Sequence, residues 1–140
     1  MLKKVGSSCY ISNLEPKTTD MFAKEVYINR RKKLRSLLSD GIAILVGNVE
    51  SPMNYPDNTY HRRQDSDFLY FFGIDLPGIA GIIDFNSGEE IIFGNDFDVD
   101  DIVWMGPQPL MADLAHGAGV SVIRPISKLE DYVHDAVNKG

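Results

Sequence analysis

The chain has 140 residues, a length that suits one domain with a buried core. Its hydrophobic content of 44% and charged content of 24% are typical of a globular protein. The net charge of −6 argues against a nucleic-acid partner, and no stretch has the length and apolarity of a membrane span. The single cysteine, Cys9, cannot form an internal disulfide, so we expect a reducing compartment and a cytoplasmic protein.

The first 20 residues are predicted to be an N-terminal extension, and residues 21–140 a domain of their own. Thr19 or Asp20 is a candidate helix cap. Apolar residues then recur at spacings of three and four up to Leu38, which predicts an amphipathic helix ending at Asp40-Gly41. The basic run 30–33 with Arg35 is interpreted as the solvated face of this helix.

Two strands are expected next, separated by a long loop. The uninterrupted apolar run 42–46 is typical of a strand buried on both faces. Residues 48–66 form a polar loop, and a loop of this length in a compact domain is usually functional or flexible. Residues 67–72 are predicted to be a strand, because Phe68 and Tyr70 alternate with other apolar residues and both faces are apolar.

The second half of the domain is predicted to be a mixture of strands and helices. Asn86-Ser87-Gly88 is a turn sequence that favours a hairpin of residues 79–85 and 90–93. The remaining expected elements are a polar loop over 95–108, a helix over 110–116, a strand over 120–123 and a last helix capped by Ser127. This order predicts a layered α/β fold, with a mixed sheet flanked by helices.

We predict no metal site in the chain. An EF-hand loop beginning at Asp96 would need glycine at Asp101 and glutamate at Pro107, so the acidic cluster is interpreted as a solvated loop. No pair of histidines has the i, i+4 spacing of a zinc-binding helix. The cluster comprises Asp96, Asp98, Asp100 and Asp101, and the histidines are His61, His116 and His134.

The most informative stretch is the run of residues 63–73, called the signature below. Arg63 can bind a carboxylate with two hydrogen bonds, and Asp65 and Asp67 are its candidate partners. Ser66 can bond local backbone. Two interpretations stay open: the charged side chains lock a long loop against the edge of a strand, or the loop points at a ligand or a neighbouring domain.

The signature reads Arg63-Gln64-Asp65-Ser66-Asp67-Phe68-Leu69-Tyr70-Phe71-Phe72-Gly73. It resembles the Arg-Gln-(Asp/Asn)-Ser-Asp-Phe-x-Tyr-x-x-Gly pattern in the N-terminal domain of Xaa-Pro aminopeptidases (aminopeptidase P). Residues 73–77 are similar to the family's Gly-Phe-x-x-Pro, and residues 104–106 to its Trp-x-Gly. The resemblance covers residues 21–140, although Tyr60-His61-Arg62 is more basic than the family's aromatic-Pro-aromatic approach.

The resemblance implies a creatinase-like N-terminal domain with a layered α/β fold. Its partner in the family is a C-terminal "pita-bread" domain, which is absent from this chain and holds two divalent metal ions, usually manganese. The parent protein would remove the N-terminal residue from peptides with proline second. None of the family's metal ligands or catalytic histidines maps onto these 140 residues, so we expect the chain alone to be inactive.

Two positions carry a substrate-related expectation. Asp57 resembles an acidic residue near the free amino end of the substrate, and Trp104 resembles a tryptophan that reaches toward a neighbouring subunit's site. A loop-capping aspartate and a partly buried tryptophan explain the same residues from sequence alone. The expected partners are the protein's own catalytic domain, further copies of the chain and a peptide substrate.

Two other functions fit the same sequence. One is a stand-alone interaction module without catalytic activity, related to the peptidase domain. The other is the N-terminal domain of a prolidase or creatinase relative, which shares the two-domain plan.

Overall fold

The computed structural model describes residues 22–56, 58–96, 98, 100, 103, 106 and 110–139. A four-stranded sheet in the order β1-β2-β3-β4 forms its centre. The strands β1, β2 and β3 are antiparallel, and β3 and β4 are parallel. Their bounds are β1 Ile42–Val46, β2 Ala80–Asp84, β3 Glu90–Phe93 and β4 Val122–Arg124.

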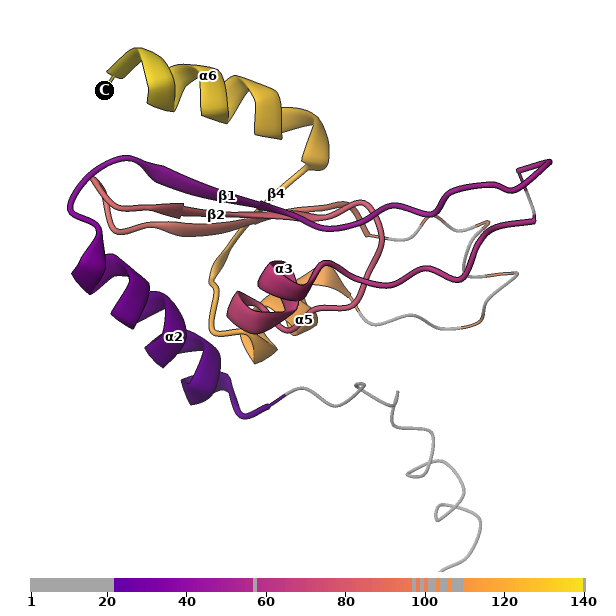
Figure 1. Ribbon diagram of the computed structural model, residues 1–140, viewed down its shortest axis with the longest axis horizontal. Coiled ribbons are helices and arrows are strands. Elements are labelled where there is room, and N and C mark those ends of the chain that lie inside the picture. The colour runs from indigo at the N-terminus through magenta and orange to yellow at the C-terminus, as the bar shows by residue number, and fades with distance from the viewer. Residues whose placement is uncertain are drawn as a thin grey trace, which may run out of the picture.

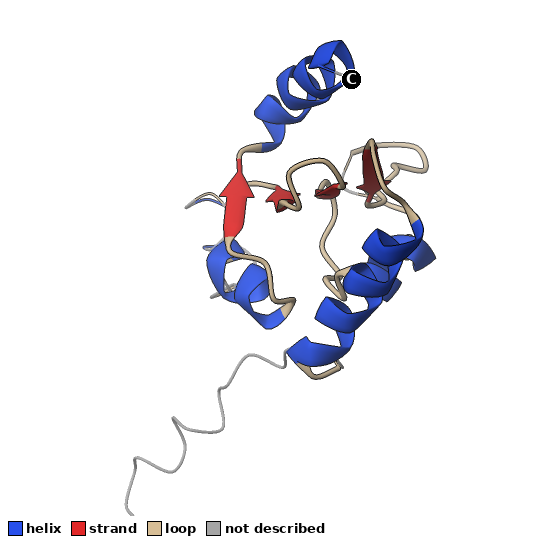
Figure 2. Ribbon diagram, turned by 90° about the vertical axis from the view of Figure 1, so that its left-hand side faces the viewer, coloured by secondary structure: helices blue, strands red, loops and turns tan. Residues whose placement is uncertain are grey.

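The helices lie on both faces of the sheet (Figures 1 and 2). One face packs against three α-helices and the other against the last α-helix and the short 3-10 helix before it, so the domain has three layers. None of the described helices is long and apolar enough to cross a membrane. Their bounds are α2 Lys24–Leu37, α3 Ser66–Phe71, α5 Met111–Gly117, the 3-10 helix η1 Ile126–Lys128 and α6 Leu129–Lys139.

The two faces of the sheet have separate apolar cores. Ile83 of β2 and Ile92 of β3 point into the larger core, which contains Phe68 of α3 and Phe72, the residue directly after α3. Ile82 and Ile91 point the other way and pack against α6. Because successive side chains of a strand face opposite sides, the central strands β2 and β3 are buried on both.

The predicted hairpin is confirmed. The side chain of Asp84 accepts hydrogen bonds from the backbone N–H of Asn86 and of Ser87, at 2.8 and 3.1 Å. Gly88 has φ +77° and its N–H bonds Asp84 O. These bonds hold the turn tightly and set the register that pairs Ile82 with Ile91.

The strand predicted over residues 67–72 is wrong, because this stretch forms α3. Asp65 is the N-cap, and its Oδ1 accepts from the N–H of Asp67 and Phe68, both at 3.0 Å. Phe68 and Phe72 are fully buried, four residues apart, while Tyr70 between them is half exposed. This spacing places the buried rings on one helical face, which the alternation of a strand would not.

The prediction that residues 42–46 are buried on both faces is also wrong. The strand β1 lies at the edge of the sheet. Ile44 and Val46 are 41% and 59% exposed, because α6 covers the neighbouring strands and only the beginning of β1. The apolar run of residues 42–46 therefore predicted a strand correctly, but it did not indicate that the strand lies at the edge of the sheet.

The first and last helices differ from their predicted starts. The α2 helix begins at Lys24 after Ala23, whose methyl group cannot act as a cap, and the predicted caps Thr19 and Asp20 lie outside the described residues. Ser127 lies within η1 and not at the cap of α6. Arg31 is completely buried, so the basic run is not wholly a solvated face.

Candidate functional site

A long segment, residues 48–63, runs out from the end of β1 and returns to α3; we call it the arm (Figure 1). Its outer part is a small hairpin. The N–H of Met53 donates to Asn58 O at 2.8 Å, and the N–H of Tyr60 donates to Ser51 O at 2.9 Å. These bonds join the outgoing and returning halves of the arm, so the two halves form one unit.

The arm carries large apolar side chains that face solvent. Four of them are half or more exposed: Val49, Met53, Tyr55 and Tyr60. A group of exposed apolar side chains on a projecting segment commonly marks a contact with another protein surface. Asp57, which follows Pro56 in the sequence, lies outside the described residues.

Gln64 holds the base of the arm. Its Oε1 accepts from the N–H of Asn48 at 2.8 Å, where the arm begins, and from that of Asp65 at 3.1 Å, just after the arm ends. Its Nε2 donates to Ile74 O at 3.1 Å and to Leu76 O at 2.7 Å. The side-chain amide is thus surrounded by four backbone partners, which offset the cost of burying it.

The beginning of the arm lies close to its end and to β2. The N–H of Gly47 donates to Ile79 O at 2.8 Å, and Asn48 Nδ2 donates to Arg63 O at 2.8 Å. A Cβ added at Gly47 would lie 2.9 Å from Ile79 O and 3.0 Å from Gln64 Oε1. Glycine is required here because the backbone passes directly against its neighbours.

The predicted ion pair of Arg63 with Asp65 or Asp67 is wrong. Within the described part of the chain no ion pair involves Arg63, and the oxygen of Asp65 is taken by the cap of α3. The neighbouring arginine makes the pair: Arg62 Nη2 lies 2.6 Å from Asp75 Oδ1. This pair joins the end of the arm to the loop that Gln64 also binds.

The remaining signature residues are divided between solvent and core. Ser66 and Asp67 occupy the first turn of α3 and are exposed, and Phe68 is buried. The guanidinium of Arg30 packs over the ring of Tyr70, with its Cζ 4.2 Å from the ring centre. Arg30 Nη1 also donates to Tyr70 O at 2.9 Å, which fastens α3 to α2.

Gly73 ends the signature with φ +67°. A Cβ at this position would lie 2.2 Å from the ring of Tyr27, which is buried against it. Both the backbone conformation and the space therefore require glycine. The signature consequently holds α3 and the start of the arm in fixed positions relative to α2.

A second long segment, residues 94–110, leaves the end of β3 and leads to α5; we call it the second loop. Asp96 Oδ1 accepts from the N–H of Met111 at 2.6 Å, so the side chain caps α5 from the opposite end of the loop. Asp96 is therefore bound to the protein backbone. Trp104 lies outside the described residues.

The arm and the second loop leave the same end of the sheet. The register pairs Val46, the last residue of β1, with Ala80, and pairs Ala80 with Phe93, the last residue of β3. The two segments thus start at the same end of the sheet, from strand ends that flank the beginning of β2. A ligand or protein surface that meets the base of one of them is therefore close to the base of the other.

The described residues do not offer a metal site. Among them, no three His, Cys, Asp or Glu side chains lie together in a way that could hold an ion. The described part of the chain thus does not fit the two metal ions implied by the resemblance. The resemblance places their ligands in the following domain.

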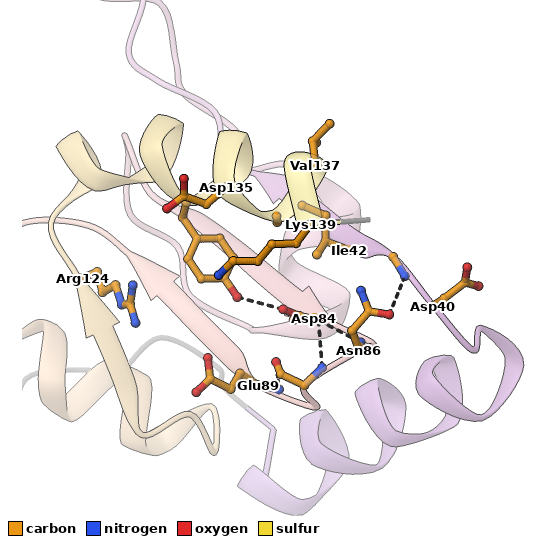
Figure 3. Close-up of a pocket in the computed structure, with 13 residues that line it drawn as sticks. Asp40, Ile42, Asp84, Asn86, Glu89, Arg124, Asp135, Val137 and Lys139 are labelled. Atoms are coloured by element: carbon orange, nitrogen blue, oxygen red, sulfur yellow. Dashed lines mark hydrogen bonds between the residues drawn. The ribbon is translucent and has the colours of Figure 1, made fainter.

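A polar pocket lies at a different place, between α6 and the β2–β3 turn (Figure 3). Tyr132 Oη donates to Asp84 Oδ2 at 3.1 Å. Burial and this bond raise the pKa of Tyr132 to about 12. Burial opposes ionisation of Asp84, but the N–H bonds from Ser87 and Asn86 outweigh it and lower the pKa of that carboxyl.

The prediction from sequence missed two residues that fasten the arm, Asn48 and Arg62. Asn48 is the first residue of the predicted long loop, and Arg62 lies directly before the signature. An asparagine directly after a strand is a turn-forming signal. The choice of Arg62 over Arg63 as the paired arginine has no local signal that we recognise.

Comparisons with known proteins agree with the fold. Residues 27–140 match the family described as "Aminopeptidase P, N-terminal domain". Among curated relatives, Arabidopsis thaliana "Intermediate cleaving peptidase 55, mitochondrial" is 29% identical over 81% of this chain and 23% of its own length. The human "Xaa-Pro dipeptidase" is 30% identical over 55% of this chain and 16% of its own length.

Solved structures share the architecture. Escherichia coli aminopeptidase P in its low-pH form has a TM-score of 0.69 and 21% identity, over 83% of this chain and 27% of that chain. Proline aminopeptidase P II from Yersinia pestis has a TM-score of 0.67 and 22% identity, over 81% and 27%. The chain therefore spans about a quarter of the length of these relatives.

Proposed function

Because the chain belongs to the aminopeptidase P N-terminal domain family, we propose that it is the non-catalytic domain of a metal-dependent Xaa-Pro aminopeptidase. In this proposal the following domain cleaves the peptide bond before proline, with two metal ions, manganese by resemblance. The present domain shapes the path by which the peptide reaches that site. The observation that carries the proposal is the common origin of the arm and the second loop at one end of the sheet.

Asp57 and Trp104 have separate roles in the proposal. The carboxylate of Asp57, on the arm, attracts the free ammonium group of the peptide. Both groups are charged at neutral pH, and a hydrogen bond between charged groups is stronger than one between neutral groups. Trp104, on the second loop, packs against the peptide or a neighbouring subunit. The exposed apolar side chains of the arm support a contact with the catalytic domain or with another copy of the chain.

Kinetics of the complete protein test the role of Asp57. Asp57→Asn should raise the KM for Xaa-Pro peptides by about tenfold or more, because a charged hydrogen bond contributes about 1.5–3 kcal/mol. The matched control is Glu50→Gln, which removes the exposed carboxylate of a different residue of the arm. An equal KM for both variants, or a loss of stability without a change in KM, would contradict the proposal.

The role of Trp104 requires a measurement of its own. Trp104→Ala should lower kcat/KM in the complete protein and leave the urea midpoint of unfolding near that of the wild type. If the tryptophan serves the core instead, the midpoint falls and the kinetics per folded molecule stay the same. Sedimentation of the same variant shows whether the residue supports association of subunits.

The activity of the isolated chain is the third test. The purified 140-residue chain, supplied with manganese, is expected not to cleave Xaa-Pro peptides, since its described residues offer no donor set for the ions. Measurable turnover would contradict the proposal that the following domain alone is catalytic.

Cell fractionation tests the proposed cytoplasmic location against the mitochondrial one that the name of the Arabidopsis relative indicates.

A further inference from the structure

Gln64, which directly follows the arm, contacts the beginning of the arm, the N-cap of α3 and the loop after α3 with a single side chain. We propose that Gln64 is a positioning residue that fixes the direction in which the arm leaves the domain. The inference deepens the proposed function and rests on it, because the direction of the arm determines where Asp57 is carried. The residue itself touches no substrate in this account.

The contacts of Gln64 support this role by their distribution. Gln64 directly follows the arm, and one of its four bonds reaches the first residue of the arm, Asn48. The other three reach the body of the domain, at the N-cap of α3, Asp65, and at Ile74 and Leu76 of the loop after α3. The residue is 2% exposed, so water cannot easily replace these bonds. The amide thus joins the arm to a fixed part of the fold.

One further strong bond, from Gly47 N–H to Ile79 O at 2.8 Å, holds the residue before the arm to the end of the sheet. The contacts of the arm itself with the body are weaker. The ion pair of Arg62 with Asp75 is partly exposed, the aspartate side chain by 49%, and such pairs contribute little. The bond from Gly78 N–H to Asn48 O is long, at 3.4 Å. The bond from Asn48 to Arg63 joins the two halves of the arm to each other and not to the body.

The chemistry of the site requires an amide. Gln64 must accept two hydrogen bonds and donate two, which a glutamine can do and an ionised glutamate cannot. A carboxylate at this position would face the carbonyl oxygens of Ile74 and Leu76 without a proton to share. Gln64→Glu should therefore release the arm at neutral pH, while Gln64→Met keeps the shape and removes every bond.

Distance measurements between two spin labels test the inference directly. The labels are placed at Tyr55→Cys on the arm and Lys33→Cys on α2, both exposed, after Cys9→Ser removes the native thiol. In the Gln64→Met background the distribution of distances should about double in width or shift its maximum, as expected when a segment is released locally. An unchanged distribution would overturn the inference.

A control variant separates positioning from general loss of stability. Ile83→Ala removes a fully buried side chain of the same core at the end of β2 away from the arm. It should lower the urea midpoint at least as much as Gln64→Met and leave the label distances as in the wild type. If Ile83→Ala broadens the distances equally, the role of Gln64 is only structural and the inference fails.

The pH response of Gln64→Glu gives a second, independent readout. Burial next to two carbonyl groups raises the pKa of a carboxyl at this site, so lowering the pH protonates it and restores one donor. The label distances of this variant should narrow between about pH 8 and pH 5, while those of the wild type stay constant. Distances that do not respond to pH in Gln64→Glu would contradict the hydrogen-bond mechanism.

Kinetics of the complete protein distinguish this inference from the proposed function. If Gln64→Met broadens the distances and raises KM about tenfold with little change in kcat, both statements hold. If the distances broaden and the kinetics per folded molecule do not change, Gln64 positions the arm but the arm does not serve substrate access. Unchanged distances refute the positioning role whatever the kinetics.

Discussion

Arg31 on α2 lies 2.8 Å from the carboxylate of Glu90 at the beginning of β3, although 59 residues separate them. The guanidinium also donates to Phe71 O at 2.6 Å and to Ala118 O at 2.7 Å. One buried side chain therefore joins α2 to β3, to the end of α3 and to the end of α5. Burial lowers the pKa of Arg31, and the charge of Glu90 opposes that shift; the group remains charged.

Loss of this arginine should be among the most damaging single changes in the domain. Arg31→Met is expected to lower the free energy of unfolding by about 3–5 kcal/mol, because it breaks a buried ion pair and leaves Phe71 O and Ala118 O without their donor. Glu90 then keeps the partly exposed Arg35, 2.8 Å away, as its partner. Urea denaturation measures the change. The double variant Arg31→Met, Glu90→Met should cost less than the sum of the two single changes, and a strictly additive result would contradict the coupling.

Gly73 and Gly78 form a matched pair for testing steric crowding. Both have φ +67°, but only Gly73 lies against another side chain, the ring of Tyr27. Gly78→Ala should cost about 1–2 kcal/mol for the backbone conformation alone. Gly73→Ala should cost clearly more in the same urea titration, because the ring of Tyr27 must move. Equal losses would show that the ring yields without cost.

The cap of α3 is testable at Asp65. Asp65→Ala removes the acceptor for two backbone N–H groups and should lower the free energy of unfolding by about 1 kcal/mol. Asp65→Asn keeps an acceptor oxygen and should retain most of the stability. If the asparagine variant is as unstable as the alanine variant, the charge of Asp65 matters more than its hydrogen bonds.

The Asp84–Tyr132 pair predicts two pH windows. Tyr132 has its pKa raised to about 12, so its contribution is complete below the ordinary tyrosine value and is lost as the pH rises toward 12. Asp84 has its pKa lowered, so its contribution is present above the ordinary aspartate value and is lost as the pH falls through the lowered one.

Titration of phenolate absorbance tests the alkaline window. The wild type should show a late component that Tyr132→Phe removes. Asp84→Asn should move that component to lower pH, since it takes away the negative charge of Asp84, which opposes ionisation of Tyr132. A late component that survives Tyr132→Phe would assign it to a different tyrosine.

Local signals in the sequence predicted the elements whose structure depends on neighbours along the chain. The β2–β3 hairpin follows from Asp84 and the Asn86-Ser87-Gly88 turn, and α5 was predicted to within a residue. The same reasoning failed for α3, because the aromatic run favours a strand by propensity. The capping role of Asp65 and the four-residue spacing of Phe68 and Phe72 were signals of a helix.

Properties that depend on distant residues could not be read locally. The burial of Arg31 requires Glu90 and Ala118, the latter 87 residues away. The exposure of Ile44 follows from the edge position of β1, which the strand's own apolar run cannot indicate. Resemblance to the family singled out Gln64, but its four partners appear only in the folded chain. The roles of Asp57 and Trp104 stay predictions.

The hairpin of the arm, from Ser51 to Tyr60, is closed by its own backbone bonds and lies beyond the residues that anchor it. Residues can therefore be added or exchanged within it at the modest entropic cost of a longer loop, while the sheet and its two cores stay as they are. The surface that this tip presents can thus change independently of the stability of the domain, and foreign hairpins can be grafted there without redesign of the sheet.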